Sequence, residues 1–117
     1  MSFISIIAYI IGGALVFLGG IFDIIAAIGV NKFPDLYTRL HAVTIGAIGG
    51  AVYPIIGSMI IVGGADWLSL HAKLSYILPM ALVAALIIIT APTGSHAVAR
   101  AGFRSGVEPV VEEKCSQ

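Results

Sequence analysis

The densest polar stretch of the sequence reads NKFPDLYTRLH and could carry proton chemistry. Tyr37 and His41 are four residues apart, so they would share one face of a helix. Because histidine changes charge near neutral pH, this pair is suited to a proton relay. Asp35 and Arg39 have the same spacing and are predicted to form an ion pair in a helix that begins near Pro34. A salt-bridged elbow at a membrane surface accounts for the same residues without any transport role.

Asp23 is the one ionisable residue that lies well inside a long apolar segment. Its helical neighbours, three and four residues away, are all glycine or alanine: Gly19, Gly20, Ala26 and Ala27. An aspartate that faces lipid costs about 2.5–3.5 kcal/mol on insertion scales, so we expect this one to face protein or water. There it could bind a proton or a cation in transit. The alternatives are a structural interface residue, or a carboxylate close enough to the surface to stay hydrated.

The elements that position these residues are predicted from composition. The 117 residues are 59% hydrophobic and 10% charged, with a mean hydropathy of +1.07, which is too apolar for an ordinary soluble domain. Apolar segments cover about residues 3–30, 42–65 and 74–92, and about 20 residues suffice to cross a membrane as a helix. We therefore predict an all-α membrane protein with three transmembrane helices over residues 1–104, and a flexible cytoplasmic tail over residues 105–117.

The basic residues predict the orientation of the chain. Five of the six basic residues lie in the first connection or after the third span, and only Lys73 lies in the second connection. Because basic residues concentrate on the cytoplasmic side, we expect the N-terminus outside and the C-terminus in the cytoplasm.

Small residues recur on the first two spans and predict close helix packing. The glycines in question are spaced mostly three, four or seven apart: Gly12, Gly19, Gly20, Gly46, Gly50, Gly57 and Gly64. Pro54 and Pro79 lie within apolar segments, where a missing N–H is expected to kink a helix. Three thin helices have little core of their own, so we expect a larger helical assembly in which partners cover the remaining faces.

Several classes of function have no support in the sequence. Six basic residues balance six acidic ones, so there is no basic face for nucleic acid. No nucleophile has an adjacent base, no glycine loop could cradle a phosphate, and no spacing suggests metal ligands or a cofactor. We therefore do not expect an enzyme.

Two motifs resemble the G subunit of Mrp-type multisubunit monovalent cation/proton antiporters. The first is FPDLYTRLHA at residues 33–42, and the second combines TAP at residues 90–92 with the pairs HA at 96–97 and RA at 100–101. The length and the three-span plan also agree, and the resemblance covers about residues 5–105. The family often has arginine where Lys32 stands and lysine where Ile45 stands, so a transport role built on that lysine is absent here.

The resemblance implies a small accessory subunit of a bacterial inner-membrane complex that exchanges Na⁺, or in some members K⁺, for protons and so supports Na⁺ extrusion and pH homeostasis. Its partners would be the other Mrp-type subunits, A to F, with the small E and F subunits nearest. The subunit would line a cation or proton path beside Asp23, Asp35, Arg39 and His41, or serve assembly alone. A homo-oligomeric, holin-like pore is the alternative from outside this family.

Overall fold

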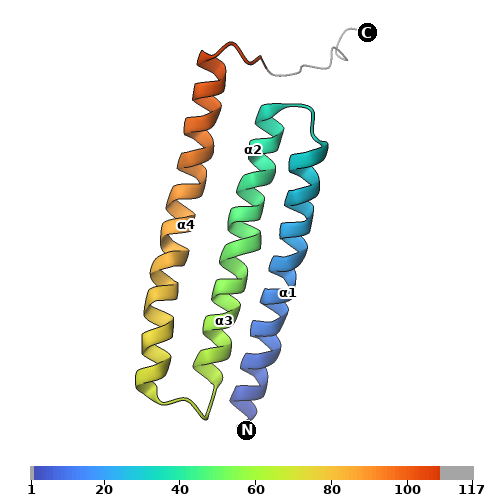
Figure 1. Cartoon of the computed structure of the whole chain (residues 1–117). Coiled ribbons are helices and arrows are strands. Elements are labelled where there is room, and N and C mark those ends of the chain that lie inside the picture. Colours follow the sequence, from blue (N-terminus) through green and yellow to red (C-terminus); the bar gives the residue numbers. More distant parts are fainter. Residues whose placement is uncertain (1, 109–117) are drawn as a thin grey trace.

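The computed structural model describes residues 2–108, and their regular structure is entirely helical (Figure 1). The elements are α1 (Phe3–Lys32), α2 (Leu36–Ile45), the π-helical segment η1 (Gly46–Val52), α3 (Tyr53–Gly64) and α4 (Leu70–Arg104). Because α2, η1 and α3 follow one another without a break, they form one continuous rod. The described chain thus contains three helices long and apolar enough to cross a membrane, which confirms the predicted three-span architecture.

The three helices stand side by side in a row (Figure 1). The rod of α2, η1 and α3 occupies the middle and contacts α1 on one side and α4 on the other. Within the described residues α1 and α4 do not touch each other. The chain therefore forms one layer of helices, and the row exposes both of its broad faces.

The contact between α1 and α3 depends on glycine. A Cβ on Gly12 would come 2.5 Å from the carbonyl oxygen of Gly57, and a Cβ on Gly57 would come equally close to the carbonyl oxygen of Gly12. Since such distances are far inside van der Waals contact, the two backbones meet here with no room for a side chain on either glycine.

The other glycines of the two predicted stripes fall into three groups. Gly19 faces Pro54 and Gly64 faces Ala8, so both extend the same contact along the two helices. Gly46 and Gly50 lie beside α1 and are described with the site below. Gly20, by contrast, has open space where a Cβ would lie, so it takes no part in packing within this chain.

The π-helical segment was not anticipated from the sequence. It follows the ten residues of α2, and Pro54 lies at the start of α3 immediately after it. Proline has no N–H to donate to the preceding turn, so the regular hydrogen-bond ladder must change near this point. The altered turn presents Gly49 to the ring of Phe22, which in turn packs edge-to-face on Tyr53 with ring centroids 5.6 Å apart.

The third helix is longer than its apolar segment. We expected the span to end near Pro92, but α4 continues as one helix through Pro79 and Pro92 to Arg104. Two residues after the helix, Gly106 has a φ of 80°, which permits the N–H of Val107 to bond the carbonyl of Gly102 at 3.0 Å. Of the predicted tail, residues 109–117 lie outside the described part of the chain.

Asp66 joins the N-terminus of α1 to the connection that follows α3. Its carboxylate accepts the backbone N–H of Ser2 at 2.8 Å, the hydroxyl of Ser5 at 3.0 Å and the hydroxyl of Ser2 at 3.2 Å. The Ser5 side chain is fully buried there. These hydrogen bonds, with that from the Ser2 N–H contributing most, hold the pKa of Asp66 below its usual value of 3.8.

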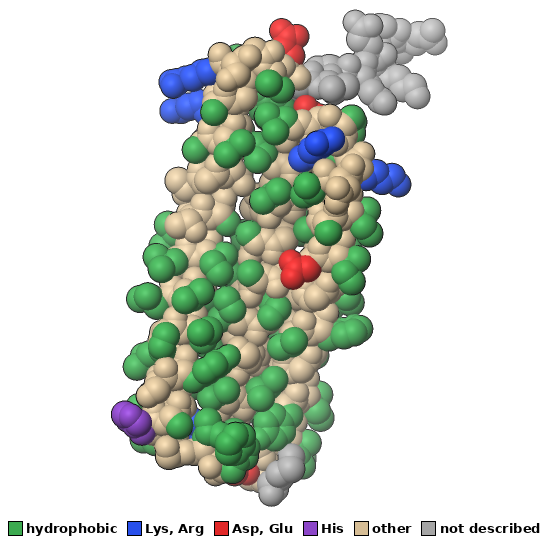
Figure 2. Space-filling view, in the orientation of Figure 1, with side chains coloured by type: hydrophobic (Ala, Val, Ile, Leu, Met, Phe, Trp, Pro, Cys, Tyr) green, Lys and Arg blue, Asp and Glu red, His purple; other side chains and the backbone are tan. Residues whose placement is uncertain are grey.

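Burial inside the described chain is sparse. Its buried hydrophobic residues are all small or β-branched: Ala26, Ala42, Val52, Ala65 and Ala84. Large apolar side chains instead point outward from every helix, and the space-filling view shows them covering the body of the molecule (Figure 2). The row is therefore held together by backbone proximity more than by interlocking large side chains.

Replacing Gly57 by alanine should lower the free energy of unfolding by about 1–3 kcal/mol, because the added methyl overpacks the contact with Gly12. Gly20→Ala is the matched control, since its Cβ enters open space and alanine is the better helix former. Unfolding of the purified chain in detergent, followed by circular dichroism, measures both. An equal loss in the two variants would contradict the packing described here.

Acidification should weaken the attachment of α1 to Asp66. The folded-state pKa of Asp66 is lowered, so its contribution to stability is present above pH 3.8 and is lost as the pH falls through the folded value. Thermal unfolding of the wild type should show this loss and Asp66→Asn should lack it, whereas Glu108→Gln, the same change of charge outside this cluster, should keep it. If Asp66→Asn and the wild type lose the same stability on acidification, the hydrogen bonds of Asp66 do not cause the pH dependence.

Candidate functional site

Asp23 of α1 lies directly against the π-helical segment. Its carboxylate oxygen Oδ1 occupies the position that a side chain on Gly50 would need, and the Cβ of an alanine at Gly46 would come 3.9 Å from the same oxygen. Glycine at position 50 is therefore required for the carboxylate to approach the backbone this closely. The altered turn and the acidic side chain form one feature, near the middle of the rod of α2, η1 and α3 and in the last third of α1.

The Asp23 side chain is exposed and has no hydrogen-bond partner among residues 2–108 of the structure. Figure 2 shows an acidic side chain on the otherwise apolar middle of the visible face. Pro54, one turn after Gly50, supplies no N–H to the Gly50 carbonyl. A carboxylate next to a backbone segment with altered hydrogen bonding can bind a proton or a cation, provided that another protein surface or water covers it.

The predicted ion pair between Asp35 and Arg39 does not form. Asp35 is the N-cap residue of α2, and its side chain makes no capping hydrogen bond. The Arg39 guanidinium instead donates from Nε to the carbonyl oxygen of Phe33 at 2.6 Å. This charge-assisted hydrogen bond holds the connection between α1 and α2 in place, and the guanidinium forms it without an acidic partner.

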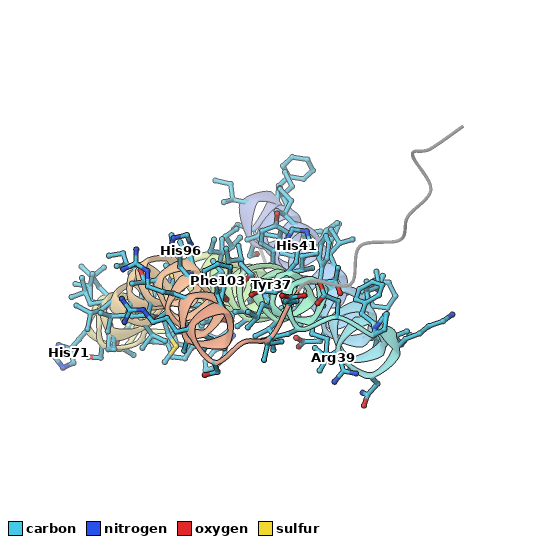
Figure 3. All side chains as sticks on the ribbon, turned by 90° about the horizontal axis from the view of Figure 1, so that it is seen from above. Tyr37, Arg39, His41, His71, His96 and Phe103 are labelled. Atoms are coloured by element: carbon cyan, nitrogen blue, oxygen red, sulfur yellow. The ribbon has the colours of Figure 1, made fainter. Side chains whose placement is uncertain are left out.

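Of Tyr37, Arg39 and His41, only Tyr37 and His41 line a common site. Viewed from above in Figure 3, Arg39 points to the outside of the row near α1, whereas Tyr37 lies beside the segment that follows α4. The Tyr37 hydroxyl donates to the carbonyl oxygen of Val107 at 3.1 Å, so it ties the end of α4 to α2. His41 lines the same groove between α2 and α4 as Tyr37, whereas Asp23 lies on α1 and is not part of that lining.

A groove between α2 and α4 brings together two histidines that are far apart in the sequence. It has a volume of about 310 Å³, and its lining includes His41 and His96. Thr44 and Ser95 also line it, and their hydroxyl oxygens lie 2.8 Å apart. The three-span topology was the signal that could have predicted this pair, because it brings the start of the second span and the end of the third to one side of the membrane.

Within residues 2–108, no group of three or more histidine, cysteine or acidic side chains could hold a metal ion. The polar groups of the described chain are therefore spread over several places, of which the Asp23 position is the only one that places an acidic group inside a membrane-length helix.

The sequence profile of a family described as "Na⁺/H⁺ antiporter subunit" matches residues 15–103, which is most of the chain. A UPF0091 protein of Pyrococcus horikoshii is 40% identical over 86 residues, covering 74% of this chain and 75% of the relative. The chain belongs to this antiporter subunit family. The family assignment confirms the resemblance deduced from the FPDLYTRLHA motif.

Curated relatives and a solved structure extend this assignment. Antiporter subunits mnhG2 of Staphylococcus saprophyticus and Staphylococcus haemolyticus are each 34% identical to this antiporter subunit over 91% of its length, and the chain spans 67% and 58% of their lengths. A chain in the structure of the Mrp complex from Dietzia sp. DQ12-45-1b is 31% identical, with a TM-score of 0.77, and the match covers 100% of this chain and 96% of that one.

Proposed function

We propose that this chain is a small subunit of a multisubunit, secondary active Na⁺/H⁺ antiporter of the Mrp type, in which other subunits carry the exchange machinery. Its family membership and its likeness to a chain of the Dietzia Mrp complex support this proposal. As a multi-pass membrane protein with little core of its own, it fits a role inside a larger assembly. The host membrane would be the bacterial cell membrane.

The position of Asp23 is the observation that supports a direct role in transport. This carboxylate is exposed in the membrane-length part of α1 and contacts the backbone at Gly50. The cost of an isolated carboxylate in hydrocarbon requires that a neighbouring subunit or a hydrated passage meet it. We infer that Asp23 borders a cation or proton path formed between this chain and its neighbours.

The remaining details of the proposal concern orientation and partners. The excess of Lys and Arg at the end that carries Arg39 and Arg104 favours a cytoplasmic location for that end, with the N-terminus outside. The small E and F subunits are the neighbours that the family resemblance implies. Asp35, Tyr37, Arg39 and His41 then lie at the cytoplasmic surface, where they would serve the interface or the mouth of a path.

A pure scaffold is the second candidate, and the exposure of large apolar side chains on all three long helices favours it. Scaffold and path differ in what Asp23 does once the complex has formed. The family assignment leaves the holin-like pore without support.

Asp23→Asn should abolish or strongly reduce Na⁺-dependent proton exchange while the complex still assembles. The amide keeps the size of the side chain but cannot carry the negative charge that a cation or proton would neutralise. Exchange is measured in everted membrane vesicles with a fluorescent pH probe, and assembly by co-purification of the other subunits with the tagged chain.

Glu108→Gln is the matched control, because it likewise turns one carboxylate into an amide, outside the described helices. It should leave exchange near the wild-type level. Normal exchange in Asp23→Asn complexes would contradict the path and leave the scaffold role. Normal exchange after deletion of the whole chain would contradict both.

A further inference from the structure

One column of side chains on α4 is apolar and faces away from the rest of the chain. Leu78, Leu82 and Ile89 are 65%, 65% and 66% exposed and lie within about a quarter turn of one another around the helix. The opposite side of α4 faces α2, since Ser95 shares a hydrogen bond with Thr44 there. Leu86, which is 52% exposed, lies on the same side, and from Leu86 to Arg100 the helix rises about 21 Å, close to the roughly 20–22 Å of one leaflet with its headgroups.

The same column becomes basic towards the end of α4. His96, Arg100 and Arg104 follow at successive steps of four residues, and all three are exposed, with His96 also bordering the groove shared with α2. They line a surface hollow of about 850 Å³ together with Pro92 and Thr93. Figure 3 shows His96 projecting from α4, and Figure 2 shows basic side chains gathered at this end of the molecule.

The length of α4 places these basic residues at the level of lipid headgroups. A helix of 35 residues measures about 52 Å, whereas the hydrocarbon core is about 30 Å thick. The turns that follow Ile89 must therefore extend into the headgroup layer. Arginine there keeps its stem on the apolar surface and its guanidinium in the polar layer, where it can bind a phosphate through two parallel hydrogen bonds.

We propose that this face of α4 binds an anionic phospholipid in the leaflet on the C-terminal side. Its phosphate would contact Arg100 and Arg104, with His96 as a further donor, and one acyl chain would lie over Pro92, Ile89 and Leu86. A lipid supplies an acid and a half-bilayer apolar chain in one molecule, which is the complement of this face. Glu108 follows the helix, and among residues 2–108 the structure gives no ion pair between it and either arginine.

The test uses the full chain, purified in mild detergent with whatever subunits accompany it. Native mass spectrometry counts the phospholipids retained after exchange into nanodiscs of phosphatidylcholine with or without phosphatidylglycerol. Arg100→Gln combined with Arg104→Gln should bind phosphatidylglycerol on the order of ten to thirty times more weakly, since each basic residue near an anionic surface contributes to such attraction. Lys32→Gln combined with Arg39→Gln, the same loss of charge at the same end, should retain the lipid.

Two further experiments identify the ligand. Inorganic phosphate and glycerol 3-phosphate should not displace the lipid, because they lack the acyl chain, and Leu86→Ser with Ile89→Ser should weaken retention without a change of charge. Equal retention in the Arg100/Arg104 variant and its control would overturn the proposal. So would full displacement by free phosphate, which indicates a simple anion site, or cross-linking of these arginines to another subunit in the intact complex.

Discussion

The direct meeting of two helix backbones is the constraint on which this structure depends. Where α1 crosses α3, the carbonyls of Gly12 and Gly57 lie so close that neither position can carry a side chain. Without water to drive apolar association inside a membrane, such close van der Waals contact is the main force available to hold helices together. The contact brings the remainder of α1 against η1, and it is there that Asp23 reaches the backbone at Gly50.

Packing through glycine also leaves the described part of the chain with few buried side chains. Helices held by glycine bury little, so large apolar side chains remain on the outside, and a single row leaves both faces uncovered. Asp23 is the costliest consequence, since a carboxylate at this depth is stable only beside water or a polar partner. The path proposed beside Asp23 and the need for neighbours therefore have one physical origin, a small-residue interface that leaves most large side chains exposed.

Much of the fold could be predicted from the sequence because hydropathy and length alone mark three spans, and the resemblance carried by the FPDLYTRLHA motif agrees with the family match over residues 15–103. The contacts were harder to predict. Helical spacing placed Asp35 beside Arg39, but a backbone carbonyl at Phe33 is the nearer acceptor, and spacing carries no information about backbone groups in a turn. The π-helical segment and the His41–His96 groove arise from tertiary placement, which periodicity does not encode.

The central claim is that this chain is completed by other subunits, and affinity purification of the tagged chain from its native membranes tests it most directly. Mass spectrometry of the eluate in mild detergent identifies what accompanies the chain. Our account predicts several hydrophobic proteins, among them two large antiporter-like subunits, in constant ratio to the tagged chain. Recovery of the chain only with copies of itself would contradict the account, because a second copy alone would not form an antiporter.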